Sequence, residues 1–198
     1  MLTTHVPGSP NFARLVYNAS SGSAPPVTHQ GNRYIEGLFT SYFDKHSLPY
    51  ELDDFDGRSD YEGFIEVNIP GTCAYLCILV FTYVLEHACV YVCVRLCPYV
   101  SRGVAYPAHS LPSCFRWLSL SAGGICTGAE VVKTDAQRKT YGGMANAPFD
   151  PCYHKACDTV DNVNQLVFIE MARCAANAVE SLALTPDLRS VMGRPKSF

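Results

Sequence analysis

A chain of 198 residues, 48% hydrophobic and 17% charged, has the length of one domain and enough apolar residues for a sizeable core. The net charge of -3 at pH 7 and the lack of a basic stripe exclude nucleic acid as the expected partner. The first twelve residues, MLTTHVPGSPNF, contain neither a charged n-region nor an apolar run, so no secretory signal peptide is expected there.

In chain order, the first predicted element is a short strand over residues 13–17 (ARLVY), followed by a polar loop over 18–32. Residues 33–46 predict an amphipathic helix, because apolar side chains recur there at helical spacing. These side chains are Ile35, Leu38, Phe39, Tyr42 and Phe43. A polar loop is expected over residues 47–61, and the alternation in FIEVNI predicts a strand over 64–69.

A second helix is predicted over residues 160–184, with Asp161 or Asn164 as its N-terminal cap. Its expected buried side consists of Leu166, Ile169, Met171, Ala175, Ala178, Val179 and Leu182. The chain after Pro186 is short and basic and is expected to be a frayed tail. Strands that alternate with helices predict an α/β fold.

Residues 71–121 differ from the rest of the chain. An uncharged run over residues 73–85 is interrupted by Glu86 and His87 before apolar residues resume. Neither part reaches the roughly 18–20 apolar residues that cross a bilayer, and a joined helix would hold a charge near its middle at a cost of about 2.5–3.5 kcal/mol. The pattern therefore favours a hydrophobic insertion, with a membrane-associated segment over residues 73–97 as the alternative.

Six of the ten cysteines belong to this segment, namely Cys73, Cys77, Cys89, Cys93, Cys97 and Cys114. Several are four residues apart, so on a helix they would share one face and could bind a soft metal ion. The spacing lacks the CxxC pattern of structural zinc sites, which favours a hydrophobic segment over a metal site. A different pair, Cys152 and Cys157, brackets a histidine in FDPCYHKACDT, where a metal site, a disulfide loop and an ordinary turn are all open readings.

Four stretches resemble a single family. They are GSPNFARLVYN (8–18), GRSDYEGFIEVNIP (57–70), GGICTGAE (123–130) and YGGMANAPFDPCYHKACDTVDNVNQ (141–165). Together they resemble the C-terminal part of the M28 zinc aminopeptidases, in the branch of leucine aminopeptidase and aminopeptidase Y. The resemblance covers residues 1–70 and 122–186 and implies a partial zinc-exopeptidase-type α/β fold, a mixed sheet flanked by helices. Residues 71–121 have no family counterpart, which a retained intron or a gene-model error would explain. Residues 187–198 would form a tail.

The resemblance implies a secreted metalloaminopeptidase, a hydrolase that uses two zinc ions to remove residues from a peptide with a free N-terminus. In such a site the metals polarise the scissile carbonyl and activate a water, and a carboxylate takes its proton. By resemblance, His154 is a metal ligand and the hydroxyl of Tyr153 stabilises the oxyanion. The resemblance also pairs Cys152 with Cys157 in a disulfide that stiffens this loop.

The substrate side of the site is likewise implied by the family motifs. Arg58 of GRSD would contact substrate, and Ile125 and Cys126 would line the substrate pocket. Cys126 stands where a phenylalanine is more usual, which changes the expected size of that pocket. Glu130 of TGAE would line the pocket rather than act as the general base.

The remaining ligands of the family have no counterpart in the chain. The second metal-binding aspartate belongs just before GSPN, where the sequence reads His5-Val6-Pro7, and we expect His5 to be solvent-exposed. One histidine does not hold zinc, because zinc sites need three or more protein ligands. The expectation is therefore an inactive C-terminal fragment of such an enzyme, and the alternative is a non-catalytic truncated or membrane-associated protein.

Overall fold

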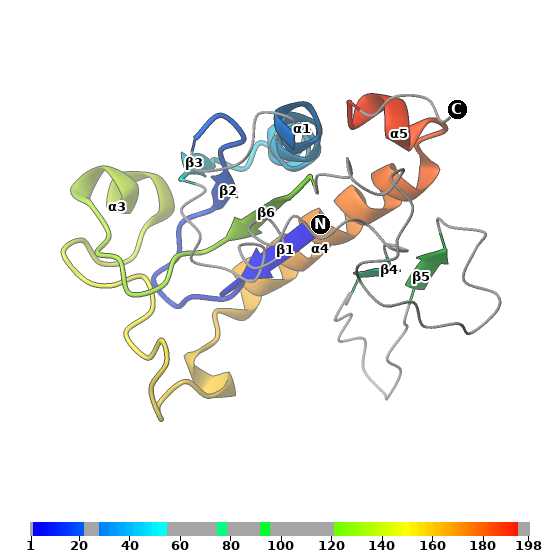
Figure 1. Ribbon diagram of the computed structural model, residues 1–198. Coiled ribbons are helices and arrows are strands. Elements are labelled where there is room, and N and C mark those ends of the chain that lie inside the picture. The colour runs from blue at the N-terminus through cyan, green and yellow to red at the C-terminus, as the bar shows by residue number, and fades with distance from the viewer. Residues whose placement is uncertain (1, 22–27, 55–74, 79–91, 96–120, 194–198) are drawn as a thin grey trace, which may run out of the picture.

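The computed structural model describes residues 2–21, 28–54, 75–78, 92–95 and 121–193 (Figure 1). Its elements in chain order are β1 (Leu2–His5), β2 (Leu15–Tyr17), α1 (His29–Lys45), β3 (Glu51–Asp53), β4 (Tyr75–Ile78), β5 (Val92–Arg95), β6 (Gly123–Cys126), α3 (Asp135–Tyr141), the 3-10 helix η5 (Val160–Asn162), α4 (Gln165–Leu184) and α5 (Leu188–Val191).

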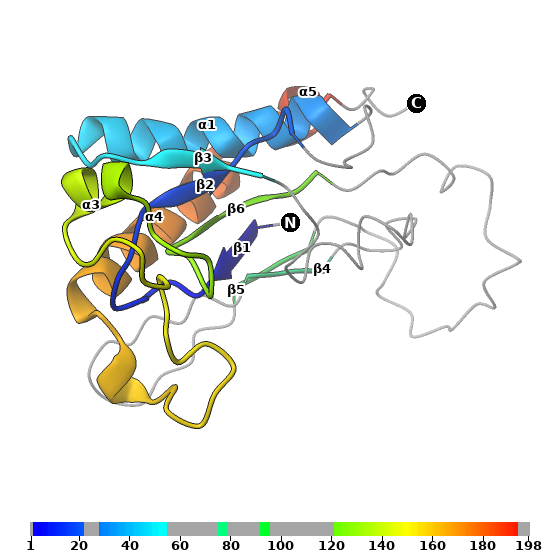
Figure 2. The ribbon, with the colours of Figure 1, turned by 90° about the vertical axis from the view of Figure 1, so that its left-hand side faces the viewer.

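The central element is a mixed four-stranded sheet in the order β1-β6-β2-β3, which Figure 2 shows from bottom to top. Strand β6 runs parallel to β1 and antiparallel to β2, and β2 runs parallel to β3. The pairing of His5 with Cys126 brings the start of the chain beside a segment 121 residues later. This sheet and its helices confirm the predicted α/β class.

Two glycines allow β6 to occupy the centre of this arrangement. A β-carbon at position 123 would lie 2.4 Å from Cγ2 of Ile35 on α1, and one at position 124 would lie 2.4 Å from the carbonyl oxygen of Thr3 on β1. Both distances are far below van der Waals contact. Gly123 and Gly124 therefore let β6 pack closely against a helix and a neighbouring strand at once.

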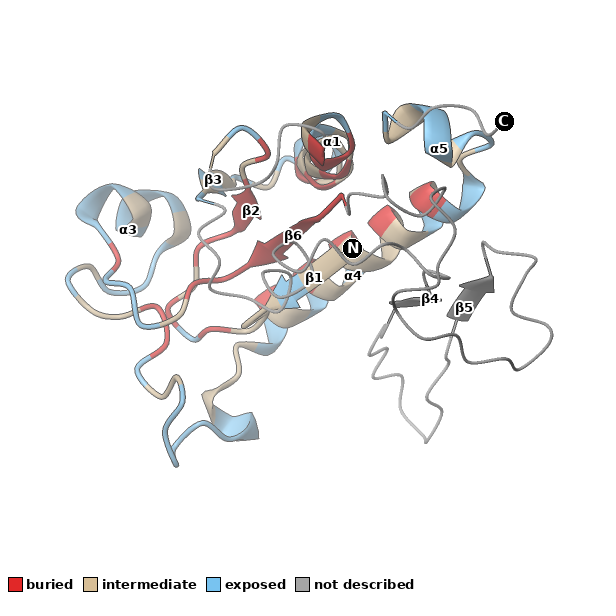
Figure 3. Cartoon of the chain, in the orientation of Figure 1, coloured by how far each residue is buried: buried red, intermediate tan, exposed pale blue. Residues whose placement is uncertain are grey.

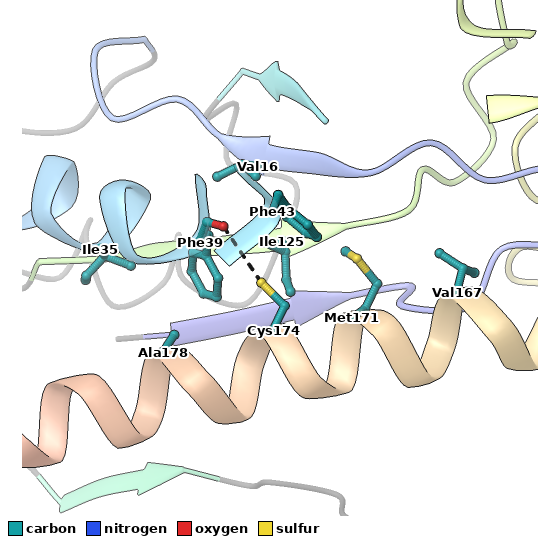
Figure 4. Packing of buried hydrophobic residues seen from close by; sticks show 9 residues of the cluster. All are labelled: Val16, Ile35, Phe39, Phe43, Ile125, Val167, Met171, Cys174 and Ala178. Atoms are coloured by element: carbon teal, nitrogen blue, oxygen red, sulfur yellow. Dashed lines mark hydrogen bonds between the residues drawn. The ribbon is translucent and has the colours of Figure 1, made fainter. Parts of the chain in front are cut away.

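Helices α1 and α4 pack on one face of the sheet and against each other. Figure 3 shows buried residues along β2 and β6 and on parts of α1 and α4. The apolar side chains of the two helices, with Val16 and Ile125 of the sheet, form one buried cluster (Figure 4). Its members are Val16, Ile35, Phe39, Phe43, Ile125, Val167, Met171, Cys174 and Ala178. The helix predicted over 33–46 is confirmed, begins four residues earlier, and buries Ile35, Phe39 and Phe43 as its spacing predicted.

The boundary of α4 shows which of the two capping candidates acts. The side chain of Asn164 accepts a hydrogen bond from the backbone N–H of Val167, whereas Asp161 lies in η5. The buried side chains then follow at Val167, Met171, Cys174, Ala178 and Leu182.

Part of the buried side predicted for this helix is wrong. Leu166 is 79% exposed and Ile169 is 46% exposed. At 100° per residue they fall away from the stripe that starts at Val167, and it is this stripe that packs against α1 and the sheet. Met171, Ala178 and Leu182 are buried as predicted.

Two further predictions change. Residues 51–53 form strand β3, although the sequence there predicted a polar loop. The expected frayed tail instead begins with α5, where the side chain of Asp187 caps Ser190 and Gln30 donates to the carbonyl oxygens of Ser190 and Val191. A short polar strand and a short helix are both fixed by tertiary contacts rather than by their own periodicity.

Strands β4 and β5 form a separate antiparallel pair in which Cys77 and Cys93 are opposite each other. The helical arrangement considered for these cysteines is therefore wrong at those two positions. Across the described ranges, no helix is long and apolar enough to cross a membrane. The strand predicted over 64–69 lies outside the described residues.

Candidate substrate and oxyanion site

The loop predicted from FDPCYHKACDT is closed by a disulfide between Cys152 and Cys157, whose Cα atoms are 5.3 Å apart. Asp150 holds both flanks of the loop from a buried position: its Oδ1 accepts from the backbone N–H of Cys152 at 2.9 Å and from Nδ2 of Asn162 at 2.8 Å. The backbone N–H of Asp150 donates to the carbonyl oxygen of Ala129, after β6. Asp150 is not among the site residues predicted from the sequence, although an aspartate before proline is a typical turn residue.

The two residues at the tip of the loop are oriented by each other. His154 has a left-handed backbone with φ of 55°, and its ring stacks on Tyr153 with centroids 3.9 Å apart. A left-handed conformation is uncommon for a residue other than glycine and is enriched at functional sites. Tyr153 is half-buried, whereas His154 is exposed.

His5, at the end of β1, completes this cluster. Its Nε2 lies 3.2 Å from the hydroxyl of Tyr153, and the two rings meet edge to face. The expectation that His5 is simply solvent-exposed is wrong, since it is half-buried against a residue 148 positions later. The signal available in the sequence was its place before GSPN, where the family carries a metal-binding aspartate.

A pocket of about 290 Å³ lies on the face of the sheet opposite α1 and α4. Strands β2, β3 and β6 and the segment after β6 supply its walls. The lining residues are His5, Leu15, Tyr17, Glu51, Leu52, Asp53, Cys126, Gly128, Ala129, Val131, Gln137 and Phe149.

The predicted substrate-contacting residues separate into three groups. Cys126 lines the pocket, and its Sγ lies 3.9 Å from Oδ2 of Asp53. Ile125 points to the other face of the sheet and belongs to the main core cluster, so the pocket does not support the substrate contact expected of it. Arg58 lies outside the described residues. Glu130 is exposed and is absent from the pocket lining.

Two titratable groups, the Lys133 ammonium group and the Tyr141 hydroxyl, are buried. The ammonium group of Lys133, a residue only 1% exposed, donates to the carbonyl oxygen of Phe12 at 2.8 Å. Burial lowers the pKa of Lys133, and the nearby charge of Glu51 opposes that shift. Burial, and next the charge of Glu51, raise the pKa of Tyr141. No nitrogen or oxygen atom in the described part of the chain meets hydrogen-bond geometry with the buried hydroxyl of Tyr141, although the Glu51 carboxylate is close enough to raise its pKa.

Replacing Tyr141 with phenylalanine is therefore expected to raise the free energy of unfolding at pH 7 by about 1 kcal/mol, because an unpaired buried hydroxyl is removed. Tyr141 ionises near pH 10 in the unfolded chain but at a higher pH in the folded chain, because its pKa is raised there. The free energy of unfolding of the wild type therefore falls above about pH 10, and the stability advantage of Tyr141→Phe grows. Urea unfolding at pH 7 and 10.5 measures both effects.

Tyr34→Phe is the control and should lose stability, since the Tyr34 hydroxyl is 2.9 Å from Oγ1 of Thr185. Destabilisation by Tyr141→Phe would contradict the unpaired hydroxyl.

The disulfide gives a second stability prediction. Replacing Cys152 and Cys157 together with alanine is expected to lower the free energy of unfolding by about 2 kcal/mol in non-reducing buffer, as chain entropy predicts for so short a loop. In reducing buffer the double variant and the wild type should be equally stable. Urea unfolding in both buffers measures this, and a difference that persists under reduction would show that the bond is not the cause.

The metal site implied by the family does not fit the described residues. Throughout the described ranges, no three histidine, cysteine, aspartate or glutamate side chains come close enough together to hold a metal ion. His154 has Tyr153 as its ring neighbour, and a zinc site needs three or more protein ligands.

Comparisons with known proteins agree with the sequence motifs. The model of Peptidase family M28 matches residues 8–179. Leucine aminopeptidase 2 of Arthroderma otae is 31% identical over 190 residues, which cover 96% of this chain and 28% of that protein. Leucine aminopeptidase 2 of Trichophyton rubrum is 30% identical over 96% of this chain and 28% of that protein. The probable leucine aminopeptidase 2 of Aspergillus oryzae is 27% identical over 94% of this chain and 27% of that protein.

The chain thus spans less than a third of the length of these relatives. The match to the family description nevertheless covers most of the chain, and the relatives carry the same aminopeptidase name. The chain belongs to peptidase family M28.

Proposed function

We propose that this chain carries the substrate-binding and oxyanion-stabilising part of an aminopeptidase that removes N-terminal residues from peptides. The observation that supports it most is the contact of Tyr153 with His5, because His5 and Cys126 both line the pocket. A peptide whose first side chain enters the pocket would place its first carbonyl group near this contact. The names of the relatives, leucine aminopeptidase 2, agree with such a substrate.

The hydroxyl of Tyr153 is the group proposed to stabilise the reaction. An O–H donor aimed at the oxygen of the scissile carbonyl stabilises the charge that develops in the tetrahedral intermediate. His5 lies at hydrogen-bond distance from this hydroxyl, and the stacked ring of His154 limits its movement. His5 is thus a positioning residue for Tyr153.

His154 is proposed as the family's metal ligand, and two zinc ions as the cofactor of the complete enzyme. Because the described residues do not fit a zinc ion, we propose that this chain alone has no peptidase activity. An assay of the purified chain with leucine p-nitroanilide and added zinc tests this, and the expected result is no zinc-dependent release of p-nitroaniline. Zinc-dependent turnover that disappears in Tyr153→Phe would overturn the proposed inactivity and support the role of Tyr153.

Secretion forms part of the same proposal. The disulfide between Cys152 and Cys157 supports it, because such bonds persist in oxidising compartments outside the cytosol. Fractionation of cells that express the chain behind a secretory signal peptide tests this against the membrane-associated alternative. Recovery of the chain in the medium is expected, and tight retention in the membrane fraction would favour the alternative through residues 73–97.

A further inference from the structure

The turn that follows β1 has an uncommon backbone conformation. Val6, directly after His5, has a φ of 44°. This left-handed conformation is disfavoured for a β-branched residue, and it persists only where the surrounding structure enforces it. Such strained positions are concentrated at functional sites, and Val6 follows the residue that contacts Tyr153. An interaction from elsewhere in the fold is therefore expected to hold residue 6.

Thr127, the first residue after β6, supplies that interaction. Its backbone N–H donates to the carbonyl oxygen of Val6 at 3.2 Å, and its hydroxyl donates to the same oxygen. Thr127 is completely buried, so water does not compete for these hydrogen bonds. The hydroxyl also accepts from the backbone N–H of Ser9 at 2.9 Å. One side chain thus holds both ends of the segment that follows His5.

This anchoring reaches the site through His5, which lines the pocket and whose Nε2 lies 3.2 Å from the hydroxyl of Tyr153. Beyond Val6 the chain is fixed again at Ser9, a buried residue whose hydroxyl donates to the carbonyl oxygen of Gly128. Because that end is fixed, relaxation of Val6 to a negative φ would displace the end of β1. The contact between His5 and Tyr153 would then be broken.

We propose that Thr127 is a positioning residue of the substrate site: its hydroxyl holds Val6 in the strained conformation and so keeps His5 in contact with Tyr153. The inference rests on the proposed function, in which the hydroxyl of Tyr153 stabilises the oxyanion. The threonine of the TGAE motif thus acts on the site through the backbone of a neighbouring segment, without contact with the substrate.

Nuclear magnetic resonance of the purified chain tests the contact directly. The wild type is expected to show a nuclear Overhauser effect between the ring protons of His5 and Tyr153, since the two rings meet edge to face. Thr127→Val removes the hydroxyl, and the effect should disappear, whereas Thr127→Ser keeps the hydroxyl and should retain it. The control Thr28→Val should also retain it, because Thr28 is equally buried at the start of α1, where its hydroxyl accepts from Nδ2 of Asn32.

Relief of the strain gives a second test. Glycine adopts a positive φ without strain, so the turn should form without the hydroxyl when Val6→Gly is combined with Thr127→Val. The Overhauser effect is therefore expected to return in this double variant, including the case in which Thr127→Val alone does not fold. A double variant that lacks the effect, folded or not, would contradict the role given to the strain at Val6.

Titration calorimetry with leucine amide separates this inference from the proposed function. We expect Thr127→Val to bind leucine amide about fivefold more weakly than the wild type and Thr127→Ser, because a displaced Tyr153 no longer donates a hydrogen bond to the carbonyl oxygen of the ligand.

The outcomes are distinct. If Thr127→Val has an unchanged circular dichroism spectrum and keeps either the Overhauser effect or the affinity of the wild type, the role of Thr127 is overturned while the substrate site stands. A wild-type chain without the Overhauser effect would overturn it as well. If the wild type shows the effect but does not bind leucine amide, the proposed function fails, and the inference that rests on it fails too.

Discussion

Replacing Phe39 with alanine is expected to lower the free energy of unfolding by about 3–5 kcal/mol. Phe39 is fully buried on α1, in the cluster that joins α4 to the sheet (Figure 4). Removing its ring takes apolar surface from the core and leaves a cavity that neighbouring side chains fill only in part. Because small domains are stable by only about 5–15 kcal/mol, a substantial share of stability would be lost.

Urea unfolding followed by circular dichroism measures this effect. Leu166→Ala is the matched control, because Leu166 lies on α4 with 79% of its surface exposed, and its replacement should change stability by no more than about 0.5 kcal/mol. Equal losses in the two variants would contradict the packing described for α1 and α4.

Replacing Glu170 with alanine is expected to cost about 2–3 kcal/mol. Oε2 of Glu170 on α4 accepts from Nη2 of Arg14 at 2.6 Å and from Nε at 3.0 Å, which ties the segment before β2 to the helix. Arg14 is buried, so removal of its partner leaves an uncompensated guanidinium group. The loss falls short of the about 3–5 kcal/mol known for fully buried pairs, since a third of the Glu170 side chain is exposed and water compensates in part.

Glu180→Ala on the same helix is the control, since Glu180 is exposed and should contribute little. Glu170→Gln should lose less than Glu170→Ala, because the amide oxygen can still accept from Arg14. If Glu170→Ala is as stable as Glu180→Ala in urea unfolding, the ion pair does not hold these two elements together.

The buried side of a helix was predictable where its sequence has a single apolar stripe. In α1 the spacing of Ile35, Phe39 and Phe43 predicts their burial, because the sheet and α4 cover that side of the helix. In α4 apolar residues occur on several sides of the helix, so hydrophobicity alone does not determine which side is buried. Its start after Asn164 puts Val167 on the side that packs against α1 and the sheet, so Leu166 remains exposed.

The disulfide loop of the candidate site was predictable from its sequence motif. The residues that the fold brings next to this loop were not predictable. The pairing of Cys152 with Cys157 followed from the family resemblance and is present. The contact of His5 with Tyr153 depends on the pairing of β1 with β6, which no local pattern predicts. Likewise, Glu51 and Asp53 line the pocket only because residues 51–53 add an edge strand to β2.

A crystal structure of the chain with leucine amide bound tests the proposed substrate site most directly. The leucine side chain is predicted to lie in the pocket near Leu15, Cys126 and Phe149, with the carbonyl oxygen within hydrogen-bond distance of the hydroxyl of Tyr153. Leucine amide bound outside this pocket, or with its carbonyl group turned away from Tyr153, would contradict the proposal that these residues bind and activate the N-terminal end of a peptide.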